Sequence, residues 1–433
     1  MRGLRYSVPL SAALLLGPSV PLSAQGIGKP SAPDFLQSLG VGSRSVAMGG
    51  AFSAIADDAS ATFWNPGRLS AVRNNQFMLD YRSVLNSQAI IKPGFSNLGA
   101  HPGQLRASFL GLVYPVYTRS RRYDAGTDKI LTGEKYQGHI GLSFTLGGYY
   151  NRDNETVTMN AGIPNEVTSQ QTIRNQFVNL SYGNKLDFGK KGRLGVGAGI
   201  VFLVHDQHFR SLDRNTDSGR TTSINSFSDQ SFNGSGTGYQ LGLSYGIGPE
   251  YRQWRLGLTY RPKIKIHFDD VQGATPGQGA AFADEVPSRT SVGIAYESDW
   301  GSRGDQIRTS FEGQFFSTAN RARVLVGNIS TLAQQDARDE SANLHFGVEF
   351  VPVNSPLRYL FGRGNTVYPI RVGFRTNDNA AKSYTFYTNV VTVGFAIQRR
   401  DRNNNTTLSF EPSAEILTRN GTVLWNLTAT LRF

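Results

Sequence analysis

The sequence contains no cysteine and no long uninterrupted run of apolar residues. Without cysteine, the chain forms no disulfide bond, no thiolate metal site and no lipid anchor on a cysteine. A transmembrane helix needs a run of about 18 or more apolar residues, and the mean hydropathy of -0.32 is lower than that of helical membrane proteins. These absences exclude disulfide-stabilised folds and membrane proteins built from helices.

Signals for metal and nucleic acid binding are also scarce. The chain has 6 histidines, none with the neighbours of a metal site, and the spacing of His205 and His208 places them on opposite faces of an extended segment. We expect histidines in solvated loops, and neither a metal nor a cofactor. The formal net charge is +12, but lysine and arginine are scattered, without the basic runs of nucleic-acid-binding proteins. The charge suits anionic lipid headgroups or an anionic permeant better than nucleic acid.

What the sequence does contain is typical of β-strands behind an export signal. Glycine accounts for 48 of 433 residues and aromatic residues for 11%, as expected for many strands that each carry one apolar face. At the N-terminus, Arg2 and Arg5 precede a short apolar stretch over residues 8–20, and Ser23 and Ala24 supply the small residues that signal peptidase prefers. We predict a signal peptide over residues 1–24 and therefore an exported protein.

The C-terminal segment shows the alternation of a membrane-spanning strand most clearly. Apolar Trp425 and Leu431 alternate with polar Asn426 and Thr428, which places apolar and polar side chains on opposite faces. Strands of about 9 to 11 residues suit a bilayer crossed at barrel tilt. The same pattern recurs over residues 307–315, 342–350 and 407–416.

Alternating segments separated by turn-rich stretches predict an all-β fold, a transmembrane antiparallel β-barrel of about fourteen strands over residues 76–433. An even strand number leaves both termini in the periplasm, and the terminal Phe433 resembles the aromatic ending that serves outer-membrane barrels as an assembly signal. The predicted strands start at Gln76, Gln104, Gln137, Ile173, Arg193, Gly238, Arg252, Val286, Gln306, Ser341, Val367, Ser383, Thr406 and Thr422. The predicted loops are residues 153–171, 211–235, 272–284 and 317–340.

Residues 25–75 do not alternate and contain clustered glycine and alanine. A barrel of about fourteen strands encloses more volume than its own inward side chains fill, so we predict that this segment folds inside the lumen as a hatch or plug. Further along the chain, Gly195, Gly197 and Gly199 occupy every second position of one predicted strand. We expect this glycine face to point inward and to leave room for the hatch or a permeant.

Six cations are candidates for ligand binding in the lumen. A charge that faces lipid would be costly, so these side chains should face the lumen or lie at an interface. In one interpretation they form salt bridges with lumen carboxylates such as Glu312 and Glu349. In the other they recognise an acidic head group, such as a fatty-acid carboxylate. The six are Arg255, Arg261, Lys263, Lys265, Arg371 and Arg375.

We expect no enzymatic activity. Gly242, Ser244 and Gly246 fit the G-x-S-x-G pattern of hydrolases, but that nucleophile requires a strand, a sharp turn and then a helix. The strand pattern continues on both sides of Ser244, so the motif belongs to a strand.

A dense motif covers residues 40–69. It pairs G-x-R-x-x-A-M-G-G-A-F, which ends at Phe52, with an Asp-Asp pair and a Trp-Asn-Pro turn. This motif resembles the start of the FadL-like outer-membrane transport superfamily, and within it the PorV/PorQ-like branch. Gly67 stands where those proteins usually have alanine, and Arg68 takes their glycine position. The candidate hatch residues in the motif are Arg44, Met48, Gly49, Gly50, Asp57, Asp58, Trp64, Asn65 and Pro66.

The residue types of this motif have structural tasks of their own. Gly49 and Gly50 permit close backbone approach or positive φ, and Asn65 begins a turn or a cap. Asp57 and Asp58 can cap a short helix or pair with arginines of the barrel wall. The segment therefore either keeps a fixed hatch folded or moves as a gate.

The resemblance implies a passive transporter of the bacterial outer membrane for hydrophobic or amphipathic, fatty-acid-like small molecules. Its partners would be outer-membrane lipid, the barrel assembly machinery and the small molecule itself. The alternative is a PorV/PorQ-type component of type IX protein secretion, which would bind secretion-system proteins and exported proteins instead of a small molecule.

Overall fold

The computed structural model describes residues 40–92, 95–124, 129–160, 163–216, 222–249, 252–272, 283–300, 305–317, 341–352, 366–376, 389–400, 406–418 and 423–433. The predicted signal peptide and residues 25–39 lie outside these ranges. Within them, no helix has the length and apolar character needed to cross a membrane.

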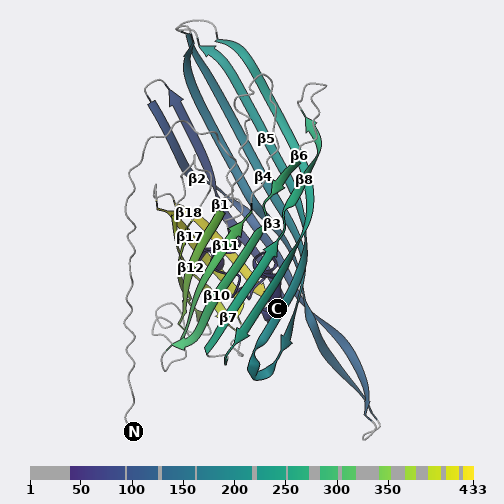
Figure 1. Ribbon diagram of the computed structural model, residues 1–433. Coiled ribbons are helices and arrows are strands. Elements are labelled where there is room, and N and C mark those ends of the chain that lie inside the picture. Colours follow the sequence, from purple (N-terminus) through teal and green to yellow (C-terminus); the bar gives the residue numbers. More distant parts are fainter. Residues whose placement is uncertain are drawn as a thin grey trace, which may run out of the picture.

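Strands of one antiparallel sheet make up nearly all of the described chain (Figure 1). They are β1 (Gln76–Lys92), β2 (Phe95–Asp124), β3 (Lys129–Asn160), β4 (Ile163–Asp187), β5 (Arg193–Thr216), β6 (Thr222–Ile247), β7 (Arg252–Arg261), β8 (Ile264–Gln272), β9 (Ala283–Val286), β10 (Arg289–Trp300), β11 (Asp305–Phe316), β12 (Ser341–Val351), β13 (Thr366–Val367), β14 (Ile370–Thr376), β15 (Asn389–Phe395), β16 (Ile397–Arg400), β17 (Thr406–Leu417) and β18 (Val423–Arg432). Four consecutive pairs, β7 with β8, β9 with β10, β13 with β14 and β15 with β16, are interrupted pieces of single strands. The result is a closed barrel of 14 strands, as the sequence predicts.

Pairing between the first and last strands closes the barrel. Gln76 of β1 lies opposite Arg432 of β18, so β1 begins and β18 ends at the same edge of the barrel. We call this edge the terminal rim; it is the lower one in Figure 1. A short helix, η2 (Gly189–Lys191), joins β4 to β5 at this rim.

The two faces of the wall differ as the alternation predicts. In β18, Trp425 is 57% exposed on the outer face, whereas the neighbouring Asn426 is only 2% exposed. Phe410 and Phe346 are likewise exposed on the outside, and Glu411 faces inward and is buried. An apolar outer face and a polar inner face are what a barrel immersed in lipid requires.

Two of the predicted loops are wrong. The described residues of the range 153–171 belong to β3 and β4, which pair as far as Asn160 opposite Ile163. Those of the range 211–235 belong to β5 and β6, and residues 161–162 and 217–221 lie outside the described residues. These strands continue above the rest of the barrel (Figure 1). Alternation of apolar and polar residues marks only strands with one apolar face, and a hairpin that is polar on both faces pairs through its backbone without that pattern. Most of the other two predicted loops, residues 273–282 and 318–340, lies outside the described residues.

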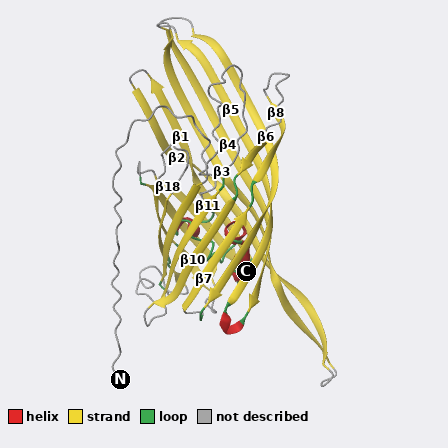
Figure 2. Cartoon of the chain, in the orientation of Figure 1, coloured by secondary structure: helices red, strands yellow, loops and turns green. Residues whose placement is uncertain are grey.

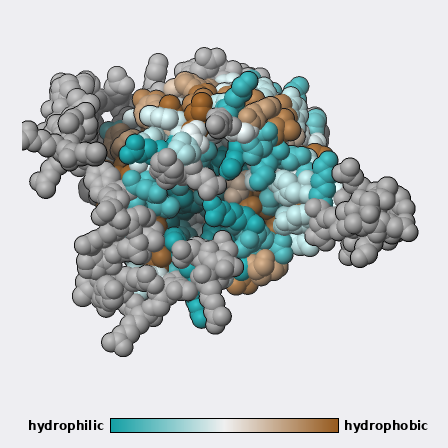
Figure 3. All heavy atoms as spheres, turned by 90° about the horizontal axis from the view of Figure 1, so that it is seen from below, coloured by the Kyte–Doolittle hydropathy of each residue, from teal (hydrophilic) through white to brown (hydrophobic). Residues whose placement is uncertain are grey.

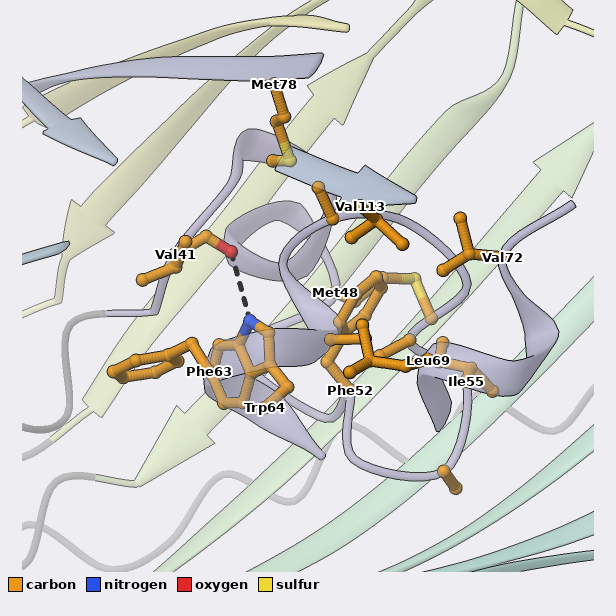
Figure 4. Packing of buried hydrophobic residues seen from close by; sticks show 14 of the residues in the cluster. Val41, Met48, Phe52, Ile55, Phe63, Trp64, Leu69, Val72, Met78 and Val113 are labelled. Carbon is orange, nitrogen blue, oxygen red and sulfur yellow. Dashed lines mark hydrogen bonds between the residues drawn. The ribbon is translucent and has the colours of Figure 1, made fainter. Parts of the chain in front are cut away.

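Residues 40–75, which we call the inner segment, fold inside the lower half of the barrel (Figure 2). The segment contains α2 (Ser43–Ala47), α3 (Ala61–Trp64) and η1 (Pro66–Ala71). Its apolar side chains form a core of their own against the wall (Figure 4). That core includes Met48, Phe52, Ile55, Phe63, Trp64 and Leu69 of the segment together with Met78, Phe109, Val113 and Ala295 of the barrel.

Candidate functional site

Glycines of the barrel wall provide the surface on which the inner segment lies. A Cβ added to Gly257 of β7 would come within 2.6 Å of the Ser53 oxygen, and one added to Gly347 of β12 would come within 2.7 Å of the Met48 Cα. Real Cβ atoms do not make such contacts, so only glycine lets the two backbones lie this close. We call the following residues, each of which contacts the inner segment, the wall glycines: Gly183, Gly197, Gly242, Gly257, Gly293, Gly347 and Gly373.

The glycine face of β5 points inward as predicted, and two of its three glycines contact the inner segment. Gly195 and Gly197 lie directly against the backbone of Pro66 and Gly67. Gly199 contacts the Ser181 side chain instead. The space that glycines leave on this strand is therefore used by the inner segment.

The Trp-Asn-Pro turn joins the inner segment to the wall. Trp64 Nε1 donates to the Val41 carbonyl at 3.0 Å, which closes the segment on itself (Figure 4). Asn65 Nδ2 donates to the carbonyls of Ser53 and Leu243, both at 2.9 Å, and its Oδ1 accepts from Gly67 N. Pro66 occupies the first turn of η1, where its missing N–H is not needed. The Asn65 side chain thus connects the turn both to Ser53 of the inner segment and to β6.

Three wall side chains satisfy the carbonyls at the end of α3. Gln240 Nε2 and Arg289 Nη2 donate to the Phe63 oxygen at 2.8 and 2.9 Å, and Thr259 Oγ1 donates to the Trp64 oxygen at 2.9 Å. Carbonyls at a helix C-terminus have no partner within the helix and carry partial negative charge. The buried Arg289 cation is therefore well placed against them.

The Gly-Gly pair makes the tightest turn in the segment. Gly49 and Gly50 have φ values of 66° and 84°, a conformation that favours glycine. Gly49 N donates to Thr392 Oγ1 at 3.1 Å, and its carbonyl accepts from His345 Nδ1 at 2.6 Å. The adjacent Met48 is fully buried, so this turn is held by β12 and β15 through specific polar contacts.

Arg44 is the main ionic link between the inner segment and the wall. Its Nε and Nη2 bind the two carboxylate oxygens of Glu349 at 2.9 and 3.0 Å, and it also pairs with Asp57. Although burial opposes ionisation, the charges of Arg44 and Arg308 outweigh it and hold the pKa of the Asp57 carboxyl well below its usual range. For Asp58, which accepts a hydrogen bond from Ser60 N at 2.9 Å, burial raises the pKa.

These contacts refine the roles expected of the two aspartates. Asp57 lies 3.9 Å from Arg308 of the wall, but its direct partner Arg44 belongs to the same segment. Asp58 caps the turn at Ser60, with its second oxygen 3.9 Å from Arg44.

Four of the six predicted lumen cations are ion-paired with described residues, one of them Lys263, which lies 3.6 Å from Glu285. Arg371 binds Glu349 at 2.7 Å and Glu411 at 2.8 Å, and Arg375 binds Glu415 at 2.5 Å. Arg255 follows the same rule with a contact of 2.6 Å to Glu297.

Among the described residues, Glu312 does not form the predicted salt bridge. It accepts from the backbone N–H groups of Phe52 and Ser53 at 2.9 and 2.7 Å, and from Gln314 at 2.9 Å. Backbone donors of the inner segment take the place of a cation there, because the segment lies directly against this part of the wall.

Lys263 and Lys265 do not point into the lumen, contrary to our prediction. Pro262 lacks an N–H and lies in the break between β7 and β8. The break shifts the alternation by one residue, so Ile264 and Ile266 become the buried, inward side chains and both lysines are exposed.

An apolar patch on the inner wall results from this shift. Arg261, the remaining predicted cation, places its guanidinium carbon 5.1 Å from the centre of the Phe177 ring, a cation–π arrangement at the edge of the patch. The patch lies farther from the terminal rim than the inner segment, since Val201 and Leu203 follow the contact glycines along β5. Its members are Phe177, Val201, Leu203, Ile264, Ile266 and Val286.

The sequence does not predict several of the buried polar residues on the inner face of the wall. We expected histidines in solvated loops, but His139, His205 and His345 are buried, because the inner face of the wall accepts polar side chains. Arg308 was not predicted as a site residue either. It lies on the polar, inward face of β11 and binds Glu349 at 2.8 Å.

Phe433 ends the chain at the terminal rim. Its ring is exposed, and its N–H donates to the Asn75 carbonyl at 3.1 Å. This bond joins the last residue to the end of the inner segment.

No family model and no curated protein matches the sequence. Solved structures do match the fold. The chain is similar to a FadL homologue of Pseudomonas aeruginosa, with a TM-score of 0.51, 12% sequence identity and coverage of 88% of this chain and 96% of that one. It is also similar to the toluene transporter TbuX of Ralstonia pickettii, with a TM-score of 0.52, 15% identity and coverage of 91% and 98%. The chain therefore has the fold of FadL-type barrels.

Proposed function

We propose that the chain is an outer-membrane transporter that passes hydrophobic or amphipathic small molecules, with the inner segment as its plug. The observation that carries this proposal is the apolar patch on the inner wall. A water-filled barrel lines its interior with polar side chains, whereas these inward side chains are apolar. They pack closely against one another and are buried, so a permeant must part them to pass. The fold shared with a toluene transporter supports the same class of permeant.

The apolar outer face and the even strand number support placement in the outer membrane. On this basis the terminal rim faces the periplasm and the long hairpins of β3 to β6 face outward. Membership of the FadL-like superfamily is supported by the fold and by the motif over residues 40–69. The PorV/PorQ-like branch and a role in type IX secretion rest on that motif alone and stay predictions.

In this transporter the chain performs two tasks. The apolar patch holds the hydrocarbon part of a permeant, and Arg261 at its edge is placed to bind an acidic head group. The inner segment closes the lumen between the patch and the terminal rim and keeps hydrophilic solutes from crossing. A permeant then crosses when the contacts of the segment with one part of the wall give way.

Uptake into proteoliposomes tests the proposal. The permeants are octanoate and a neutral aromatic hydrocarbon, with glucose as the hydrophilic solute. Ile266→Gln places a polar group in the patch and we expect it to reduce uptake of both permeants at least fivefold, while Lys265→Gln, one residue away on the outer face, leaves uptake unchanged. Fast glucose entry through the wild type, or full uptake by the Ile266 variant in a folded barrel, would show that the patch does not define the permeant.

A further inference from the structure

Four arginines surround the carboxylate of Asp57 near the terminal rim. We call Arg44, Arg68, Arg255 and Arg308 the arginine cluster. Arg255 and Arg308 each lie in the fourth position of a strand that begins at this rim, β7 and β11. Seen from below, hydrophilic residues gather across the mouth of the barrel at this end (Figure 3).

Asp57 is the most accessible carboxylate among these arginines. Its side chain is 25% exposed, compared with 9% for Glu297 and 2% for Glu349. Glu297 and Glu349 also have more direct partners in the described chain, with two arginines on Glu297 and three on Glu349. Asp57 has one direct partner, Arg44, while Arg308 lies 3.9 Å away. Asp57 is therefore the carboxylate of this group that another anion can replace most easily.

Arg68 lacks a full set of partners among the described residues. It is only 8% exposed, and its Nε donates to the Ala56 carbonyl at 3.2 Å. Its buried Nη2 has no hydrogen-bond partner in the described chain. Burial, followed by the nearby charge of Arg255, lowers the pKa of Arg68 to about 9. A buried guanidinium in this condition gains from an additional acceptor.

The charges of the group are nearly balanced, so an incoming anion must replace one of the resident carboxylates. Four guanidinium groups face the carboxylates of Asp57, Glu297 and Glu349. Asp58 adds a fourth carboxylate, 3.9 Å from Arg44, and accepts hydrogen bonds from Ser60. Attraction between opposite charges is stronger in a partly buried site than in water.

We propose that the arginine cluster is a binding site for a carboxylate or similar oxyanion and that Asp57 is its resident occupant. An incoming carboxylate takes the place of Asp57 beside Arg68 and Arg308, whose planar guanidinium groups bind carboxylates with paired hydrogen bonds. The displaced Asp57 then no longer ties its turn to Arg44. Anion binding at the terminal rim therefore loosens the inner segment.

The anion has two potential sources. It is either the head group of an amphipathic permeant, which rests on the proposed function, or a free anion from the solution at the terminal rim. Both carry the same chemistry, so octanoate, acetate and octanol separate them. Octanoate shares its charge with acetate and its alkyl chain with octanol.

The experiment measures binding of these three probes to the full-length protein in detergent by calorimetry. Asp57→Asn removes the resident anion and keeps the shape of the side chain, so we expect it to bind carboxylates at least tenfold more tightly than the wild type. Asp206→Asn is the matched control, because Asp206 pairs with Arg174 at 2.7 Å in β4 and β5, away from the cluster. We expect wild-type affinity from the control.

The outcomes distinguish the two sources of the anion and test whether the site exists. Tighter binding of octanoate than of acetate, without binding of octanol, identifies an amphipathic head group, whereas equal binding of octanoate and acetate identifies a free anion. Equal affinity of the Asp57 variant and the wild type, or the same gain in the Asp206 variant, overturns the site. These measurements need no transport, so they fail independently of the uptake assay.

A second variant covers the case in which the Asp57 variant does not fold. Arg68→Met removes a guanidinium that no carboxylate holds in a direct ion pair in the described chain. We expect it to weaken octanoate binding at least fivefold in an otherwise wild-type protein. Unchanged affinity in this folded variant would also overturn the site.

Discussion

Arg44 of the inner segment and Glu349 of β12 form a two-pronged ion pair, with Nε and Nη2 of the arginine 2.9 and 3.0 Å from the two carboxylate oxygens. Glu349 also binds Arg308 and Arg371. The inner segment is thus connected to a network that spans three neighbouring strands, β11, β12 and β14. Loss of this pair is the most direct way to weaken the plug without altering the outer face of the barrel.

We expect Arg44→Gln to loosen the inner segment and to raise the flux of small hydrophilic solutes into proteoliposomes severalfold. Breaking a buried ion pair costs about 3 to 5 kcal/mol, and the lower end applies because Glu349 keeps its two wall partners. Arg174→Gln is the control, since its pair with Asp206 is about 40% exposed and such pairs contribute about 0 to 1 kcal/mol. Equal flux in both variants would exclude Arg44 as a link that keeps the plug closed.

The second prediction concerns the close packing of the inner segment against the wall glycines. Gly257→Ala places a methyl group within 2.6 Å of the Ser53 oxygen, so the inner segment must shift, and we expect faster proteolysis of the segment and increased solute flux. Gly313→Ala is the control, because its methyl group would meet only ring carbons of Phe315 at 3.2 Å. Both variants insert as heat-modifiable barrels in gel assays. If Gly257→Ala behaves like the control, close backbone packing does not determine how the segment is seated.

Phe433 supports a third prediction, about assembly. Deletion of this residue removes an exposed aromatic side chain and the hydrogen bond to Asn75, and we expect at least a fivefold loss of heat-modifiable barrel in outer-membrane fractions. Phe433→Tyr keeps both features and inserts normally. Normal insertion of the truncated chain would show that this residue does not act as an assembly signal.

The fourth prediction concerns pH. The pKa of Asp57 lies below its usual range in the folded protein, so its ion pair stabilises the plug above an unfolded pKa of about 3.9 and this contribution is lost as pH falls through the lower folded value. We expect the difference in solute flux between Asp57→Asn and the wild type to be constant from about pH 7 to pH 5 and to shrink below about pH 4. A difference that already disappears near pH 6 would contradict the depressed pKa.

The sequence predicts those strands whose two faces differ in polarity and does not predict the others. Strands such as β18 and β12 follow from alternation because one face lies in lipid, and lipid tolerates few polar side chains. The upper parts of β3 to β6 do not follow from it, because their sequences are mostly polar and do not alternate. The predicted direction of Lys265 is wrong for another reason. The break at Pro262 shifts the alternation by one residue, so the side chains of β8 that were expected to face inward face outward.

The site is predicted less completely than the fold. The motif identifies Arg44 and Asn65 as important, but their partners Glu349 and Leu243 lie in strands far along the chain. Which strand passes the inner segment at a given height depends on the tilt and stagger of the barrel. Glycine alternation, as in Gly195 and Gly197, is a local signal that does reveal where the wall approaches the segment.

The hydrogen bond between Ser43 and Thr428 joins residues separated by 385 positions. The ribosome adds Ser43 long before it adds β18, so the contacts between the inner segment and the barrel wall cannot be complete while the chain is being synthesised. Contacts over such separations form slowly, because the loop between them must close first. Docking of the inner segment and closure of the barrel by β18 are therefore late and mutually dependent steps, and the order of synthesis is not the order of folding.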